Sequence, residues 1–262
     1  VQQIEELKYL LKIMPIFVTS IIVNIPVGQQ AIFGVSQALK MDRNLGHNFE
    51  IHAGSVNVIL MLSIGVFLPI YDQIIAPALE KITKQEGGGG GGGGLTTLQR
   101  IGLGHAFGVL SMVVSGLVEI KRRELAISKG ASDGVAPMSV IWLAPQFMLL
   151  ACCHVFGTVG HTEFFNKESP DGMKSIGNSL LCLNVSAASN LSSFIVNIVH
   201  SYTRKLGQPD WLDGDINQGR LEYFYFIIAA LGVLNVLFHI LFSSLSLQDS
   251  YERLKLAQNL AI

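Results

Sequence analysis

Two histidines and a threonine stand at helical spacing inside an otherwise apolar stretch, residues 140–165. His154, Thr158 and His161 are separated by four and three residues, so on a helix they share one face. Polar side chains at membrane depth are costly, usually face the interior of a helical bundle and often mark a pathway. The stripe indicates either the wall of a solute path or histidines that bond to neighbouring helices. We favour the solute path, with all three residues contacting the solute.

The spacing of the sulfur and nitrogen ligands in this stretch argues against a metal site. Cys153 and His154 are adjacent and point to different helix faces, while Cys152 and His161 lie more than two turns apart. The sequence contains neither an H-E-x-x-H nor a C-x-x-C pattern. We therefore predict no metal.

Eight consecutive glycines at 87–94 are the most conspicuous low-complexity segment. A phosphate-binding loop needs Lys and Ser or Thr after its last glycine, and here Leu95 and Thr96 follow. A flexible linker is the simpler interpretation. With no cofactor loop and no nucleophile–base set, the sequence does not predict an enzyme.

The stretch 10–38 also carries polar groups and two prolines. Asn24 and Gln29 are expected to reach the same solute path as the histidines. Pro26, like Pro15, removes a backbone hydrogen bond and predicts a bend that could serve as a gating hinge or stay static. The stretch 176–201 is rich in serine and asparagine, which fits a tight helix–helix interface and a cavity wall equally well.

The elements that must position these groups are membrane-spanning helices. Half of the residues are hydrophobic, only 14% are charged, and the mean hydropathy is +0.46. A bilayer core of roughly 30 Å needs about 20 residues of apolar helix. Six stretches meet this requirement: 10–38, 53–74, 98–118, 140–165, 176–201 and 221–242. We predict an all-α membrane protein, a six-helix bundle over 1–247 followed by a polar tail at 248–262.

The charge pattern limits partners without fixing orientation. A formal net charge of -1, with no basic stripe, excludes nucleic acid as an expected partner. With the six predicted spans, the 18 Lys and Arg residues divide evenly between the two sides of the membrane. The positive-inside rule therefore does not decide which side the N-terminus occupies.

Short sequence strings, found in order along most of the chain, resemble the plant nitrate/peptide transporter family. They are PIYD at 69–72, LQRIGLG at 98–104, WLAPQ at 142–146, EFF at 163–165, PDGMKSIG at 170–177, LSSF at 191–194 and GRLEYFY at 219–225. This family is related to the proton-dependent oligopeptide transporters of the major facilitator superfamily, and the nitrate and glucosinolate branch looks nearest. The resemblance implies twelve spans in two halves, of which this chain is like the second, C-terminal half with a cytoplasmic N-terminus.

The resemblance also implies roles for single residues. Relatives usually have a substrate-site glutamate in the fourth of these spans, where this chain has His154. Asp72 and Glu163 fall in family strings associated with gating and structure, although Gln73 replaces the arginine that usually follows Asp72. These departures put the substrate and the coupling chemistry of a family member in question.

Taken as a resemblance, the function is that of half a proton-coupled symporter for nitrate, glucosinolate-like or peptide-like solutes. Its partners would be the solute, the lipid bilayer and an N-terminal six-helix half. No cofactor is expected, and protons would be the coupling ion. We expect the plasma membrane rather than the vacuolar membrane. The alternatives are a truncated product without transport activity and a membrane module that pairs with intact relatives.

An even number of spans predicts that both termini lie on one side of the membrane. Single cysteines in place of Gln3 and Gln258, in a cysteine-free background, should react with a membrane-impermeant reagent from the same side. Labelling of the two positions from opposite sides would rule out six spans.

Overall fold

The computed structural model describes residues 2–45, 49–78, 81, 96–129, 134–168, 174–205 and 210–260. The octaglycine segment at 87–94, expected to be a linker, lies outside the described residues. The description below concerns the six long helical segments and the connections between them.

Six helical segments are long and apolar enough to cross a membrane, as the predicted fold class requires. They are built on α1 (Gln2–Leu39), α2 (Val56–Ile70), α4 (Thr97–Lys129), α5 (Ala144–Glu168), α6 (Lys174–Lys205) and α7 (Leu221–Leu260), and the second of them, Ala53–Ala78, includes the turns on both sides of α2. A short 3-10 turn precedes α2 and another precedes α5, and α2 continues into a π-helical turn at Tyr71–Ile75. Two helices extend well beyond their expected spans. α4 continues past residue 118, and α7 continues through the expected polar tail as one helix.

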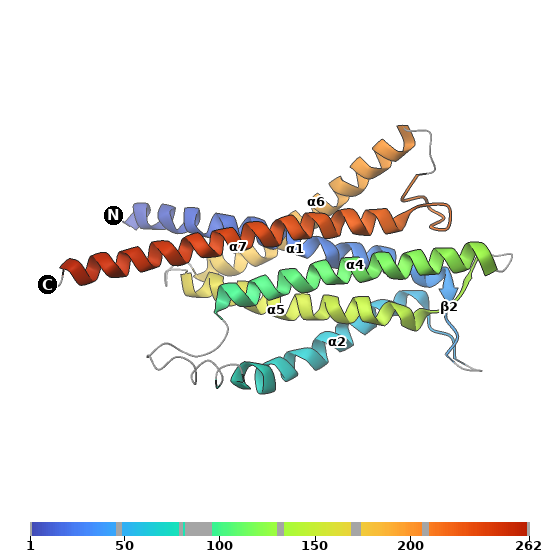
Figure 1. The fold of residues 1–262 in the computed structure, drawn as a ribbon, viewed down its shortest axis with the longest axis horizontal. Coiled ribbons are helices and arrows are strands. Elements are labelled where there is room, and N and C mark those ends of the chain that lie inside the picture. The colour runs from blue at the N-terminus through green and yellow to red at the C-terminus, as the bar shows by residue number, and fades with distance from the viewer. Residues whose placement is uncertain are drawn as a thin grey trace.

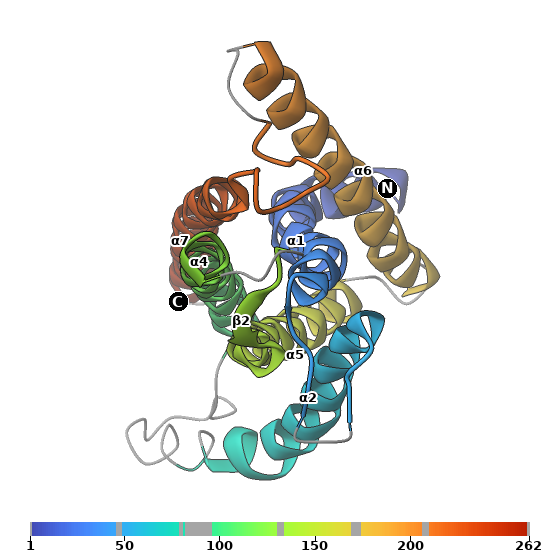
Figure 2. The same ribbon diagram turned by 90° about the vertical axis from the view of Figure 1, so that its right-hand side faces the viewer.

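The helices lie along one long axis, with the N- and C-terminal ends of the chain at the same end of the bundle (Figure 1). Viewed along that axis, α1, α4, α5 and α7 form the centre, and α2 and α6 project from opposite sides (Figure 2). At the end away from the termini, strand β1 (Met41–Asp42) pairs in parallel with β2 (Ala136–Ser139). The loops after α1 and α4 are thereby joined.

Glycines bring α4 and α5 into close contact. A Cβ on Gly104 would lie 2.7 Å from the backbone nitrogen of Gly157, and one on Gly160 would lie 2.8 Å from the Ile101 side chain. Small residues let two membrane helices approach until their backbones touch, which compensates for the weak hydrophobic drive between helices in lipid. α5 is thus held on α4 with little room for adjustment.

A fully buried ion pair lies near the far end of α4. Glu119 and Arg122 are both 0% exposed, and two guanidinium nitrogens of Arg122 donate to the two carboxylate oxygens at 2.6 and 2.9 Å. The expected span ended at 118, which would have left both charges at the membrane surface. Instead, the helix continues, and the pair is enclosed by neighbouring helices.

Side chains from four other segments surround this ion pair. Gln37 of α1 donates from its amide to Glu119 at 2.7 Å, and its carbonyl accepts from Gln146 of α5 and Tyr225 of α7, each at 3.2 Å. Arg122 also donates to Asn217 at 2.7 Å. Four helices and the loop before α7 therefore converge on one polar network.

Asp210 ties the connection between α6 and α7 back to the end of α6. Its carboxylate lies 2.5 Å from the His200 ring and 3.2 Å from Arg204, and it accepts from the Thr203 hydroxyl and the Leu212 backbone, each at 3.1 Å. Partial burial raises the pKa of Asp210, but the hydrogen bonds from His200, Leu212 and Thr203 outweigh it and hold the pKa below its ordinary value.

The first structural prediction concerns the buried ion pair. Arg122→Met should lower the free energy of unfolding by about 3–5 kcal/mol, because it leaves the Glu119 carboxylate buried without its cation. The double variant Glu119→Leu with Arg122→Met should lose less, since no uncompensated charge remains. Lys121→Met is the matched control, because Lys121 pairs with Glu124 at the same helical spacing with both side chains more than 60% exposed. Denaturant unfolding in detergent micelles measures all three. A loss for Arg122→Met no larger than for Lys121→Met would contradict this account.

The second prediction concerns pH. Because the folded pKa of Asp210 is depressed, its stabilising effect is fully present above the unfolded-state pKa of about 4 and is lost as pH falls through the folded pKa. Asp210→Asn should therefore lower Tm at pH 7, and the gap to the wild type should narrow at about pH 3. Asp213→Asn, which alters a carboxylate that among the described residues accepts from the Asp215 backbone, should show a smaller gap at pH 7. A gap that does not depend on pH would be evidence against the carboxylate as the cause.

Candidate solute-binding site

A cavity of about 160 Å³ lies where α1, α5 and α6 meet. Its wall is apolar for the most part, with valine side chains from α1 and valine and leucine side chains from α6. The polar groups on it are Ser20, Asn24, His154, Thr158, His161 and Asn184. The arrangement matches the general form of small-molecule sites, an apolar pocket with a few placed polar groups.

The α5 residues of the predicted stripe meet at this cavity. His154 and Thr158 are within hydrogen-bond reach of each other, with 3.2 Å between the hydroxyl and ring Nδ1. Thr158 is exposed and His154 half-buried, while His161, one turn further on, is 3% exposed. The structure places the three on one face of α5; that they contact solute remains a prediction.

α1 and α6 supply the opposite wall through a pair of asparagines. The Asn24 amide donates to the Asn184 carbonyl at 2.9 Å and to the backbone oxygen of Ser20 at 2.8 Å. The Asn184 amide in turn donates to the Ser20 hydroxyl. These bonds hold α1 against α6 and set the orientation of both amides beside the cavity.

Gln29 is placed differently from the sequence-based expectation. It is 1% exposed, and its amide donates to the hydroxyl of Ser192 on α6. It does not line the cavity described above. In this structure, Gln29 fastens α1 to α6 about one turn beyond Asn24.

Glu163 joins α5 to the start of α4 at the end of the bundle that carries the termini. Its carboxylate accepts from Arg100 at 2.5 Å and from the Thr97 hydroxyl at 3.1 Å. The Arg100 guanidinium also lies over the Tyr71 ring, 5.3 Å from its centroid. The ion pair therefore links three helical segments, an arrangement that suits the structural or gating role expected of Glu163.

The two remaining expected gating residues lie in separate places. Asp72 is exposed on the π-helical turn that follows α2. Pro26 lies within α1, which continues as one helix through it, and borders a small void between α1, α4 and α7. Neither lies on the wall of the solute cavity.

Two sets of buried polar residues were missed by reading the sequence. The first is the Gln37–Glu119–Arg122 network; opposite charges three residues apart beside an apolar run were its available signal. The second is His105 and His239, which lie near His161. A histidine inside an apolar span is itself a signal of a polar site, and both could have been found on that basis.

The chemistry of the cavity is hydrogen bonding rather than catalysis. Amides, two hydroxyls and imidazoles can donate to an anionic or strongly polar solute, and the cavity lining contains no carboxylate among the described residues. The part of the chain that the structure describes also contains no group of three or more His, Cys, Asp or Glu residues able to hold a metal ion.

A helical bundle of six spanning segments is the architecture of an integral, multi-pass membrane protein. The family profile described as "PTR2: POT family" matches residues 1–212. The chain belongs to the POT family, which is a family of transporters and not of enzymes.

Plant members of the same family are similar over nearly the whole chain. Protein NRT1/PTR FAMILY 2.13 of Arabidopsis thaliana is 48% identical over 238 residues, covering 91% of this chain and 37% of that protein. Putative protein NRT1/PTR FAMILY 2.14 of Arabidopsis thaliana is 47% identical, covering 91% of this chain and 41% of that protein. The chain thus spans about two fifths of the length of these relatives.

Solved structures show the same fold. An auto-inhibited POT family peptide transporter superimposes with a TM-score of 0.66 at 21% identity, over 90% of this chain and 41% of its own. A POT family transporter in complex with 5-aminolevulinic acid superimposes with a TM-score of 0.61 at 13% identity, again over 90% and 41%. At these identities the likeness establishes the fold alone.

Proposed function

We propose that this chain acts as the C-terminal half of a proton-coupled secondary transporter for small anionic or peptide-like solutes, such as nitrate or glucosinolates. The observation that carries the proposal is the polar cavity between α1, α5 and α6 in a chain of the POT family. Solute would contact His154, Thr158 and His161 on one wall and Asn24 on the other. We place the protein in the plasma membrane in preference to the vacuolar membrane.

The exposed face of α6 supports pairing with a further set of helices. The spanning windows of α2 and α6 are each only 17% buried, against 50% for α4 and α5. The exposed side chains of α6 include a polar row, made up of Ser186, Ser189, Asn190, Ser193 and Asn197. Polar groups inside a span face protein or water rather than lipid, so lipid does not suit this face. An N-terminal six-helix half would cover it and close a solute path beside the cavity.

His154 supports a preference for anions. Its imidazole is neutral or cationic, whereas the glutamate that resembling proteins carry at this position is anionic or neutral. The remaining polar groups on the cavity wall are uncharged donors and acceptors. A solute carrying negative charge would therefore be better tolerated here than beside a carboxylate.

Substitutions of His154 in the complete transporter, with its N-terminal half, test the proposal. His154→Ala should reduce anion uptake, because the solute loses a donor, and His154→Glu should reduce it further through repulsion. Uptake followed from about pH 5 to 8, where histidine changes charge, should show a changed pH profile in both variants.

His52→Gln is the matched control, because His52 caps the 3-10 turn before α2, on an exposed surface away from the cavity. It should leave uptake and its pH profile unchanged. Uptake, affinity and pH dependence that are the same in wild type, His154→Ala and His154→Glu would defeat the role of His154 in solute contact.

A further inference from the structure

Three histidines from three helices meet inside the bundle. His105 of α4, His161 of α5 and His239 of α7 are each 3% exposed or less. The His105 ring centroid lies 5.9 Å from that of His161 and 5.0 Å from that of His239. These separations put the ring nitrogens within reach of direct or single-water bridges. The cluster is distinct from the solute contacts proposed above, which it touches only through His161.

Backbone carbonyls fix which nitrogen carries the proton on two of the rings. His161 Nδ1 lies 2.7 Å from the Gly157 oxygen, and His239 Nε2 lies 2.9 Å from the Leu98 oxygen. A carbonyl oxygen can only accept, so each of these nitrogens must bear hydrogen. In the neutral rings, His161 Nε2 and His239 Nδ1 are consequently acceptors with a free lone pair.

The unpaired nitrogens of all three rings are buried. His161 Nε2, His239 Nδ1 and both nitrogens of His105 have no hydrogen-bond partner among the described residues. A neutral His105 offers one hydrogen and one lone pair, so it cannot satisfy both neighbouring acceptors at once. One additional proton would supply the missing donor. The cluster therefore has fewer N–H donors than lone-pair acceptors.

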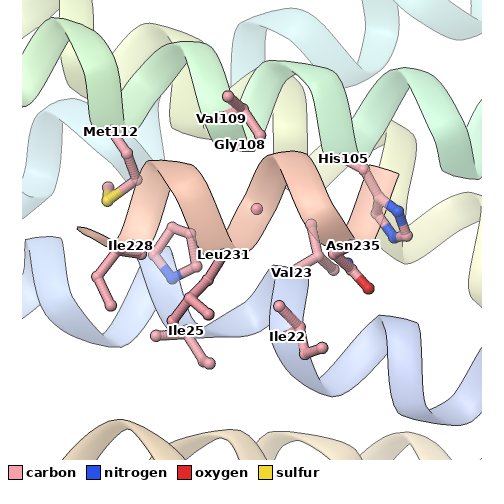
Figure 3. Close-up of a pocket in the computed structure, with 12 residues that line it drawn as sticks. Ile22, Val23, Ile25, His105, Gly108, Val109, Met112, Ile228, Leu231 and Asn235 are labelled. Atoms are coloured by element: carbon pink, nitrogen blue, oxygen red, sulfur yellow. The ribbon is translucent and has the colours of Figure 1, made fainter. Parts of the chain in front are cut away.

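A small void extends the cluster toward α1. It measures about 10 Å³, near the smallest space that holds one water molecule. In Figure 3, His105 and Asn235 lie together at one end of this void, and Met112 and Ile228 lie at the other, apolar end. The Asn235 carbonyl oxygen is buried and unpaired, while its amide donates to Thr19. A water there would have His105 and Asn235 as polar partners.

Few charges surround the cluster. In the sequence, Arg100 stands five residues before His105 and Glu163 two residues after His161, and these two pair with each other at 2.5 Å. α5 also presents the buried thiol of Cys153 beside Gly108 of α4. On α1, Ile13–Leu39 carries no charged residue, and His239 is the titratable group that α7 presents. Glu163, the carboxylate beside His161 in the sequence, is thus already paired with Arg100.

We propose that His105, His161 and His239 bind one proton as a single unit, taken up from the solute cavity on which His161 borders. The proton adds to a free ring lone pair, forming one N–H bond, and leaves a water molecule of the cavity as hydroxide or a hydronium ion as water. The two rings that stay neutral accept from the protonated one, directly or through a bridging water. A second proton would place two cations side by side in a low-dielectric interior, so binding stops at one.

A role of the cluster as the source of the coupling proton depends on the proposed transport function. Proton binding by the cluster does not depend on it. The test uses the chain labelled with 15N-histidine in lipid nanodiscs, and the seven histidines are assigned by single substitutions. At about pH 8, ring 15N shifts should show the Nδ1–H tautomer for His161 and the Nε2–H tautomer for His239. Between about pH 8 and 4, all three rings should respond in one shared step that corresponds to one proton.

His105→Phe keeps a ring in place without its nitrogens, and His105→Gln keeps a polar group should the first variant fold poorly. In either variant, the responses of His161 and His239 should separate into unlinked steps. His52→Gln, outside the cluster, should leave the shared step unchanged. Independent titration of the three rings in the wild type, or no protonation down to about pH 4, would overturn the proposal. Because uptake is not measured, loss of transport and loss of proton binding are separate results.

Discussion

The Glu119–Arg122 ion pair imposes the strongest constraint on this bundle. Two opposite charges with no exposure to solvent are tolerated only if every donor and acceptor around them is met, since an uncompensated buried charge costs several kcal/mol. Gln37 of α1 and Asn217 of the loop before α7 bond directly to the two charges. Gln146 of α5 and Tyr225 of α7 then bond to Gln37. The positions of four helices at the far end of the bundle therefore follow from one pair of residues on α4.

At the other end, the helices are held by packing and by a partly buried ion pair rather than by a fully buried one. Gly104 and Gly157 let the backbones of α4 and α5 touch, and Arg100 and Glu163 then bridge the same two helices. This close approach is also what sets His161 beside His105. The glycines thus place the histidine cluster, and the solute cavity adjoins this contact, because Gly157 and His161 also line it.

Much of the fold could be predicted because the constraint behind it is local to the sequence. Six apolar stretches of spanning length can be recognised from the sequence of each stretch alone. The same is true of the face that His154, Thr158 and His161 share. Partners across helices were harder, because they depend on packing that no spacing rule encodes. Tyr225 stands only two residues from Tyr223, yet it is buried and bonded to Gln37, whereas Tyr223 lies against Trp211. Gln29 turned toward Ser192 for the same reason.

The parallel pairing of β1 with β2 has a mechanical consequence. It joins the loop that follows α1 to the loop that follows α4, while Asn217 holds the third loop through Gly134 and Arg122. All three connections at that end are thus hydrogen-bonded to one another. The helices that they join cannot separate there independently. A solute path can then open in two ways. The helices can tilt together as one rigid body against the protein surface that covers α6, or they can bend near the end that carries the termini.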